Sequence, residues 1–177
     1  MNRASKRIIT SLLLLVFLLG GFSTAPLRAF AEYRVIEYSD GDIFKGNVLQ
    51  NGKKDGSGTY TFIDGTIITG NWRNGVLEEK VHIEYPNGEE YIGGFKNGVK
   101  YGKGKYYFEN GDVYNGSWKN DKMHGKGKYT WDNEWSLSGK WKKGKINGKC
   151  KLKTKKYIYT IKCKKGKLKK IISKRKR

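Results

Sequence analysis

The chain has 177 residues, of which 30% are charged and 14% are aromatic, and its formal net charge at pH 7 is +21. This length leaves room for one ordinary domain or one short array of repeats. Two cysteines and two distant histidines are too few ligands for a structural zinc site, so we predict neither a metal nor a cofactor.

The first 31 residues have the organisation of a secretory signal peptide. Arg3, Lys6 and Arg7 precede the apolar run ITSLLLLVFLLGGF, and AFA at 29–31 supplies a cleavage signature. The apolar run is shorter than the roughly 20 residues of a membrane-spanning helix. We predict export, with a mature chain that begins near Glu32 and is secreted or held at the cell envelope. An uncleaved membrane anchor and a buried core helix are the alternatives.

One motif recurs through residues 32–166. Its clearest copies are YIGGFKNGVKYGKGKYYFENG and YNGSWKNDKMHGKGKYTWDN. Aligned on an aromatic–Gly–aromatic pattern, successive copies are offset by 24, 23, 23, 23 and 22 residues and begin at Phe44, Ile68, Tyr91, Tyr114, Leu137 and Tyr159. Such a period predicts an array in which each unit is stable only against its neighbours.

Within a copy, aromatic residues and glycines alternate with polar residues, which predicts strands with one buried face. The pattern is clearest at Tyr91, Gly93, Phe95, Gly102, Gly104, Tyr106 and Phe108. Asn97-Gly98 and Asn110-Gly111 separate these runs, and Asn-Gly favours tight hairpin turns. The predicted fold is all β, an elongated single-layer solenoid of about five to six stacked antiparallel hairpins.

The pattern resembles the MORN repeat (membrane occupation and recognition nexus), whose consensus runs like Y-x-G-x-W-x-x-G-x-x-x-G-x-G-x-Y-x-x-x-x-G. The resemblance covers about Tyr33 to Gly166 and is most specific at Tyr91 to Trp131. The second copy has Glu79 and Val81 in place of the Gly-x-Gly, and the last two copies lose several aromatic residues. The resemblance implies that His124, which precedes a Gly-x-Gly, is a repeat residue. It also implies a binding or scaffolding role, with membrane association suggested by the family name.

The repeat also predicts which residues meet across strands. We expect the second Gly of each Gly-x-Gly to lie opposite an aromatic residue of the next unit, because a glycine leaves space for a large ring. The predicted aromatic face comprises Trp72, Phe95, Trp118, Trp141, Tyr106 and Tyr129. The predicted opposed pairs are Gly58–Trp72, Val81–Phe95, Gly104–Trp118, Gly127–Trp141 and Cys150–Cys163.

Both cysteines of the chain fall on the last of these pairs. In an exported protein, opposed cysteines on adjacent strands normally form a disulfide. We therefore predict a bond between Cys150 and Cys163 that clamps the last hairpin; the alternative is two independent small apolar residues.

Nothing in the sequence has the pattern of a catalytic site. The histidines, His82 and His124, are almost two repeats apart, and the Gly-Lys-Gly-Lys runs lack the spacing of a P-loop. An acid/base pair among Glu78, Glu79, Glu89 and Glu90 is less well supported than a solvated face. We predict that the protein is not an enzyme.

Positive charge is concentrated at the carboxyl-terminal end, where Lys140 to Arg177 contains 19 of the 37 Lys and Arg residues and no acid follows Glu134. A nearly neutral body with a basic end predicts an electrostatic contact. Residues 167–177 form a basic tail. The longer segment from Lys149 to Arg177 either caps the array or attaches it to anionic lipid headgroups or envelope polyanions. The predicted contact residues are Lys149, Lys151, Lys153, Lys155, Lys162, Lys164, Lys165, Lys167, Lys169 and Lys170.

The sequence thus predicts a non-catalytic, exported repeat protein that contacts an anionic membrane surface, a polyanion or a protein partner. The alternative is a structural module that self-associates as a homodimer or binds a peptide in its aromatic groove. The basic composition and interleaved aromatics would also suit nucleic acid, but the export signal argues against that ligand.

Overall fold

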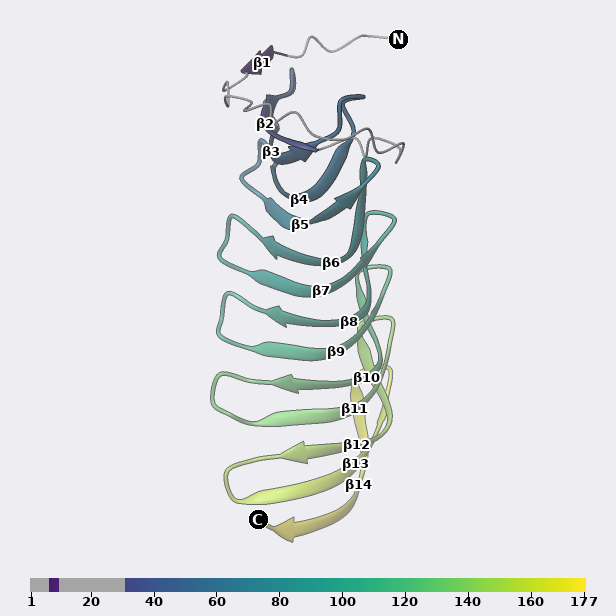
Figure 1. Ribbon diagram of the computed structural model, residues 1–177. Coiled ribbons are helices and arrows are strands. Elements are labelled where there is room, and N and C mark those ends of the chain that lie inside the picture. The colour runs from purple at the N-terminus through teal and green to yellow at the C-terminus, as the bar shows by residue number, and fades with distance from the viewer. Residues whose placement is uncertain (1–6, 10–30) are drawn as a thin grey trace, which may run out of the picture. The chain divides into compact units, whose positions relative to one another are not determined.

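The structure is a computed structural model that describes residues 7–9 and 31–177 (Figure 1). Every regular element of these residues is a β-strand, and the predicted all-β fold of repeated hairpins is confirmed. Apart from Arg7–Ile9 and Ala31, the predicted signal peptide lies outside the described residues. Within the described ranges, no helix is long and apolar enough to cross a bilayer.

The chain forms two compact units, Met1–Leu77 and Glu78–Arg177. In the first unit, neighbouring strands pair antiparallel in chain order. Its core consists of Ile36, Phe44 and Val48, against which Trp72 packs. The strands of this unit are β1 (Arg7–Ile9), β2 (Glu32–Glu37), β3 (Ile43–Val48), β4 (Lys54–Thr61) and β5 (Ile67–Arg73).

The second unit is also a single-layer antiparallel sheet whose strands follow one another in chain order (Figure 1). Residues 167–176, which have the composition of a basic tail, form its last strand and pair with the strand before it. The strands are β6 (Val76–Glu84), which begins just before the unit, β7 (Glu90–Lys96), β8 (Val99–Tyr107), β9 (Val113–Lys119), β10 (Lys122–Thr130), β11 (Ser136–Lys142), β12 (Lys145–Lys153), β13 (Tyr157–Lys164) and β14 (Lys167–Lys176).

Two kinds of turn join the strands. Asn97 and Gly98 both have positive φ (51° and 79°), as a two-residue hairpin turn requires, so this predicted turn is confirmed. At Asn110-Gly111 only Gly111 has positive φ (81°), and the Gly111 N–H donates to the carbonyl of Phe108. This second turn is therefore longer than a two-residue hairpin.

The strand register differs from the predicted one by two residues. Trp118 lies opposite Gly102, whereas Gly104 lies opposite Gly116. The same offset separates Gly58 from Trp72, Gly127 from Trp141 and Cys150 from Cys163. The prediction of direct opposition is wrong, because the second glycines align with other glycines instead. The row across β7 to β11 is Gly93, Gly104, Gly116, Gly127 and Gly139.

Aromatic rings explain this row of glycines. A Cβ atom at Gly104 would lie 2.5 Å from Cε2 of Tyr91, and one at Gly127 would lie 2.6 Å from Cζ of Tyr114. Both tyrosines are fully buried. The predicted contact between glycine and tryptophan survives as a diagonal one, since the indole N–H of Trp118 donates to the carbonyl of Gly104 at 3.1 Å.

Candidate anion-binding groove

Lysines recur at one position of the repeat, on the sheet face that points away from the aromatic rings. Lys105, Lys128 and Lys151 lie on alternate strands β8, β10 and β12, and the intervening strands place small polar residues opposite them. Alternate strands are about 9.5 Å apart, so the lysines form a regular ladder. The complete row from β8 to β14 is Lys105, Asn115, Lys128, Ser138, Lys151, Thr160 and Ser173.

An open groove with a volume of about 1140 Å³ follows this ladder over β8 to β13. Glycines form part of its lining and leave it open, since they have no side chain. Short polar side chains also line it, namely those of Asn115, Ser138, Asn147 and Thr160. Six lysines line it: Lys103, Lys126, Lys128, Lys140, Lys149 and Lys151. We refer to these six residues as the groove lysines.

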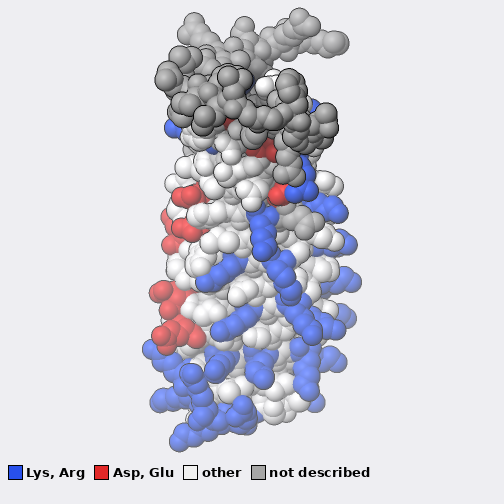
Figure 2. Space-filling model, viewed as in Figure 1, with Lys and Arg blue, Asp and Glu red and all other residues white. Residues whose placement is uncertain are grey.

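The charge of this face is uncompensated. No strand from β8 to β14 contains Asp or Glu, because the acidic residues of this part of the chain lie in turns. Among the described residues, no carboxylate lies within ion-pair distance of a groove lysine. Figure 2 shows basic side chains spread over the visible surface of the second unit, with acidic side chains grouped along one flank. The arrangement suits a ligand with several negative charges.

The predicted contact lysines are divided among several places. Lys149 and Lys151 line the groove, and Lys149, Lys162 and Lys170 stand opposite one another as a second row. Lys153 is the last residue of β12, and Lys155 lies in the turn that follows it. The hairpin β13–β14 and its turn hold Lys164, Lys165, Lys167 and Lys169.

Sequence reasoning missed Lys103, Lys126, Lys128 and Lys140. A signal for the first three was present, because Gly-Lys-Gly-Lys recurs in successive copies with the lysines at alternate positions. The repeat alone does not show that these lysines gather on one face, because their neighbours across the sheet depend on the strand register.

The aromatic face is filled by its own rings. Trp118 contacts Tyr91 and Tyr114 edge-on, at centroid distances of 5.4 and 5.2 Å. Its exposed fraction is 6%, and that of Trp141 is 7%. The predicted face residues Tyr106 and Tyr129 pack against these two indoles. Packing of this kind stabilises the sheet and leaves little ring surface for a peptide.

The MORN repeat model matches residues 49–67, 91–113, 114–136 and 138–156. These four stretches of the chain are MORN repeats. The unmatched part between residues 67 and 91 contains the copy in which Glu79 and Val81 replace the Gly-x-Gly. MORN repeats generally act as non-catalytic binding or scaffolding modules.

A comparison with curated protein sequences gives no match. Among solved structures, one similar chain is the TCP domain of SAS-4 (dCPAP) from Drosophila melanogaster, solved in complex with a proline-rich motif of Ana2 (dSTIL). The alignment covers 79% of this chain and 93% of that chain, at 15% sequence identity and a TM-score of 0.40.

Tyrosine–carboxylate hydrogen bonds tie the MORN hairpins to their turns, and sequence reasoning missed them. Burial alone would raise the pKa of the Asp112 carboxyl, but hydrogen bonds from Tyr129, the Asp132 N–H and Asn110 lower it below its ordinary value. The signal in the sequence was a recurring spacing of 17 or 18 residues between an acidic residue and a tyrosine. The bonds are Tyr60 to Asp42 (2.8 Å), Tyr106 to Glu89 (2.8 Å) and Tyr129 to Asp112 (2.6 Å).

The histidines are not brought together. His82 lies between Glu84 and Glu90, at 3.8 and 3.3 Å, whereas His124 lies on β10 opposite Ser117. Within the described residues, no three His, Cys, Asp or Glu side chains gather as a metal site would require.

The cysteines are close together and buried. The Sγ atoms of Cys150 and Cys163 are 3.0 Å apart, as free thiols. Burial, together with the neighbouring Cys163 sulfur, raises the pKa of the Cys150 thiol to about 12. The disulfide stays a prediction.

Proposed function

We propose that this MORN-repeat protein is an exported, non-catalytic scaffold that contacts an anionic surface through its groove lysines. The observation that carries the proposal is a groove lined by six lysines, over strands that contain no acidic residue. The signal-peptide pattern of residues 1–31 supports a location where membrane headgroups and envelope polyanions are available.

The expected affinity follows from the number of lysines. Each lysine close to an anionic membrane contributes about 1 kcal/mol, so six in register supply about 6 kcal/mol at low salt. That free energy corresponds to a dissociation constant between about 1 mM and 1 μM. Binding must weaken as salt rises, because the Debye length falls from about 10 Å at 0.1 M to about 3 Å at 1 M.

Co-sedimentation with vesicles across a salt series tests the proposal. We expect the protein to bind vesicles that contain phosphatidylglycerol, and not vesicles of phosphatidylcholine alone. Serine should replace four groove lysines in one variant (Lys126, Lys128, Lys149 and Lys151) and four exposed lysines near hairpin turns in a control of equal charge (Lys119, Lys122, Lys142 and Lys143).

The groove variant should lose binding and the control should keep most of it. Equal losses would show that net charge, rather than the groove, is responsible. Binding that ignores vesicle charge would contradict the proposal. Competition by soluble polyphosphate tests whether an envelope polyanion also occupies the groove.

One observation favours self-association as a second function. Every residue of β14 is exposed, and Leu168, Ile171 and Ile172 are 50–57% exposed. An exposed strand of this kind can accept another strand, although its lysines would repel a second copy. Light scattering over a concentration series would show a dimer, and a form ending at Lys165 should then be monomeric.

A further inference from the structure

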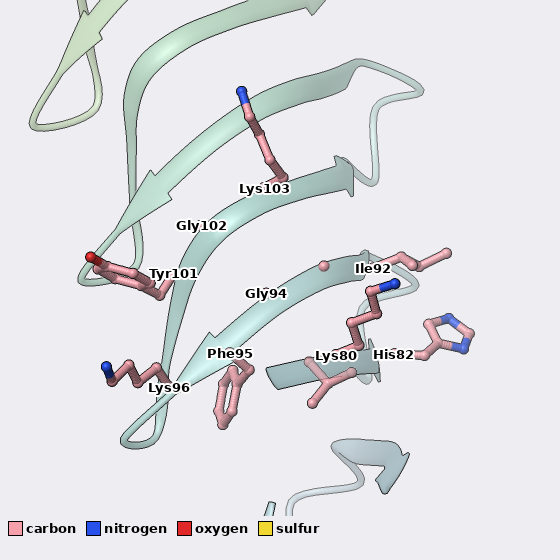
Figure 3. A pocket seen from close by; sticks show the side chains of 11 residues that line it. Lys80, His82, Ile92, Gly94, Phe95, Lys96, Tyr101, Gly102 and Lys103 are labelled. Carbon is pink, nitrogen blue, oxygen red and sulfur yellow. The ribbon is translucent and has the colours of Figure 1, made fainter. Parts of the chain in front are cut away.

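A second cavity, of about 680 Å³, lies over β6, β7 and β8 within the second unit (Figure 3). Its volume is within the range of about 300–1,000 Å³ that is usual for small-molecule sites. Figure 3 shows Gly94 in the middle of the site, with Tyr101 and Lys96 on one side and Ile92, Lys80 and His82 on the other.

The cavity lies where this repeat departs from its neighbours at three positions. Gly94 stands where the next copies have Ser117 and Lys140, and a Cβ atom there would collide with the carbonyl oxygen of Tyr101, so the backbones of β7 and β8 approach closely at this point. Ile92 and Tyr101 likewise stand where the next copies have polar residues, Asn115 and Ser138 for the isoleucine and His124 and Asn147 for the tyrosine. This copy has therefore exchanged polar side chains for apolar ones at two exposed positions.

The apolar residues of the cavity remain accessible. Ile92 is 47% exposed and Tyr101 is 45% exposed. Exposed apolar side chains that are grouped in a cavity, rather than scattered singly, indicate a binding site.

Cations surround this apolar surface. Lys80, Lys96 and Lys103 line the cavity and are exposed, and the ammonium group of Lys96 lies 6.0 Å from the ring centre of Tyr101. The nearby carboxylates of Glu84 and Glu90 face His82, at 3.8 and 3.3 Å. An apolar floor with a positive rim matches a molecule that has one anionic head and an apolar body.

We propose that this cavity binds an amphiphilic anion, in which a carboxylate or phosphate head contacts the lysines and an alkyl chain covers Ile92 and Tyr101. Neither part alone satisfies the site: a phosphate ion leaves the apolar floor in water, and a neutral alcohol leaves the ammonium groups without a counter-charge. The site stands independently of the groove, although Lys103 borders both.

Isothermal titration calorimetry with monomeric dodecyl phosphate tests this proposal. The protein is the one purified after expression of the full-length chain. We expect saturable binding of dodecyl phosphate, with at least tenfold weaker binding of inorganic phosphate and of dodecanol. The double variant Ile92→Asn/Tyr101→His, which installs the residues of the next copy at exposed positions, should weaken binding at least tenfold.

A matched pair of variants tests the charged rim. Lys96 and Lys119 occupy the same position in successive copies, and only Lys96 lines the cavity. Lys96→Ser should weaken dodecyl phosphate binding several-fold, whereas Lys119→Ser should leave it unchanged. Equal effects of the two variants, or dodecanol binding as tight as that of the phosphate, would overturn the proposal.

A competition experiment identifies the source of the ligand. If phosphatidic acid vesicles displace dodecyl phosphate, the cavity takes the lipid from a bilayer; if they do not, it takes free amphiphiles. The four-lysine groove variant should keep dodecyl phosphate binding, so failure of one site is distinguishable from failure of the other.

Discussion

The architectural role of the Gly-x-Gly is tested by adding a single methyl group to it. In the structure, a Cβ atom at Gly127 would lie 2.6 and 2.7 Å from ring carbons of Tyr114. Tyr114 is fully buried, and its hydroxyl donates to the carbonyl of Ser117 at 3.1 Å, so the ring has no free space to enter. Overpacking of this kind costs about 1–3 kcal/mol.

Gly127→Ala should therefore lower the melting temperature by about 2–12 °C, since a chain of this size loses about 2–4 °C per kcal/mol. His124→Gln, three residues away, is the matched control, because it leaves the glycines and the tyrosine ring intact. Thermal melting followed by tryptophan fluorescence measures both. A larger loss for the histidine change, or no loss for the glycine change, would refute the architectural reading of the motif.

Three further outcomes are expected. Mature protein should contain a disulfide between Cys150 and Cys163, seen as a linked peptide in mass spectrometry and worth about 3 kcal/mol; free thiols after export would contradict it. Asp112→Asn should lower the free energy of unfolding at neutral pH, measured by chemical denaturation. The difference from the unmodified protein should shrink below about pH 4, because a carboxylate whose pKa is lowered in the folded state stabilises the fold only while it is ionised. Lys100→Met should lower the free energy of unfolding in urea less than Lys100→Ala does. The ammonium group of Lys100 lies 5.3–5.8 Å from the centres of four aromatic rings, and methionine keeps favourable ring contacts. Equal losses would show that the ammonium charge is essential.

The sequence was sufficient for the hairpins and insufficient for their register. Alternation and Asn-Gly turns predict strands directly, and Asn97-Gly98 behaves as expected. The register depends on where the buried rings lie. Tyr91 and Tyr114 cover the glycines of their own and the next strand, which forces glycine opposite glycine. Tryptophan has the larger ring and was the expected neighbour, but the tyrosine rings are the ones that lie over the glycines.

The candidate site was predicted only in part, for a related reason. Lys149 and Lys151 were expected from the density of charge near the carboxyl terminus, but Lys126 and Lys128 lie in copies where acids in the turns balance the total. Net charge averages over both faces and all turns, whereas a ligand meets one face. Only the register shows that Lys128 shares a row with Lys151 and that Lys126 lies opposite Lys140.

The two faces of the sheet differ in what they do: the aromatic face holds the fold together, and the other face carries the candidate binding sites. A MORN match therefore says little about what this chain binds. The glycine row and the buried rings fix the aromatic face, so substitutions there change stability. The other face carries no such constraint, and one repeat position holds Thr59, His82, Lys105, Lys128 and Lys151 in successive copies. A consensus that consists of glycines and aromatic residues does not include this position. The lysine ladder and the cavity at Gly94 both arise on this unconstrained face, which is where repeats can acquire ligands without losing the fold.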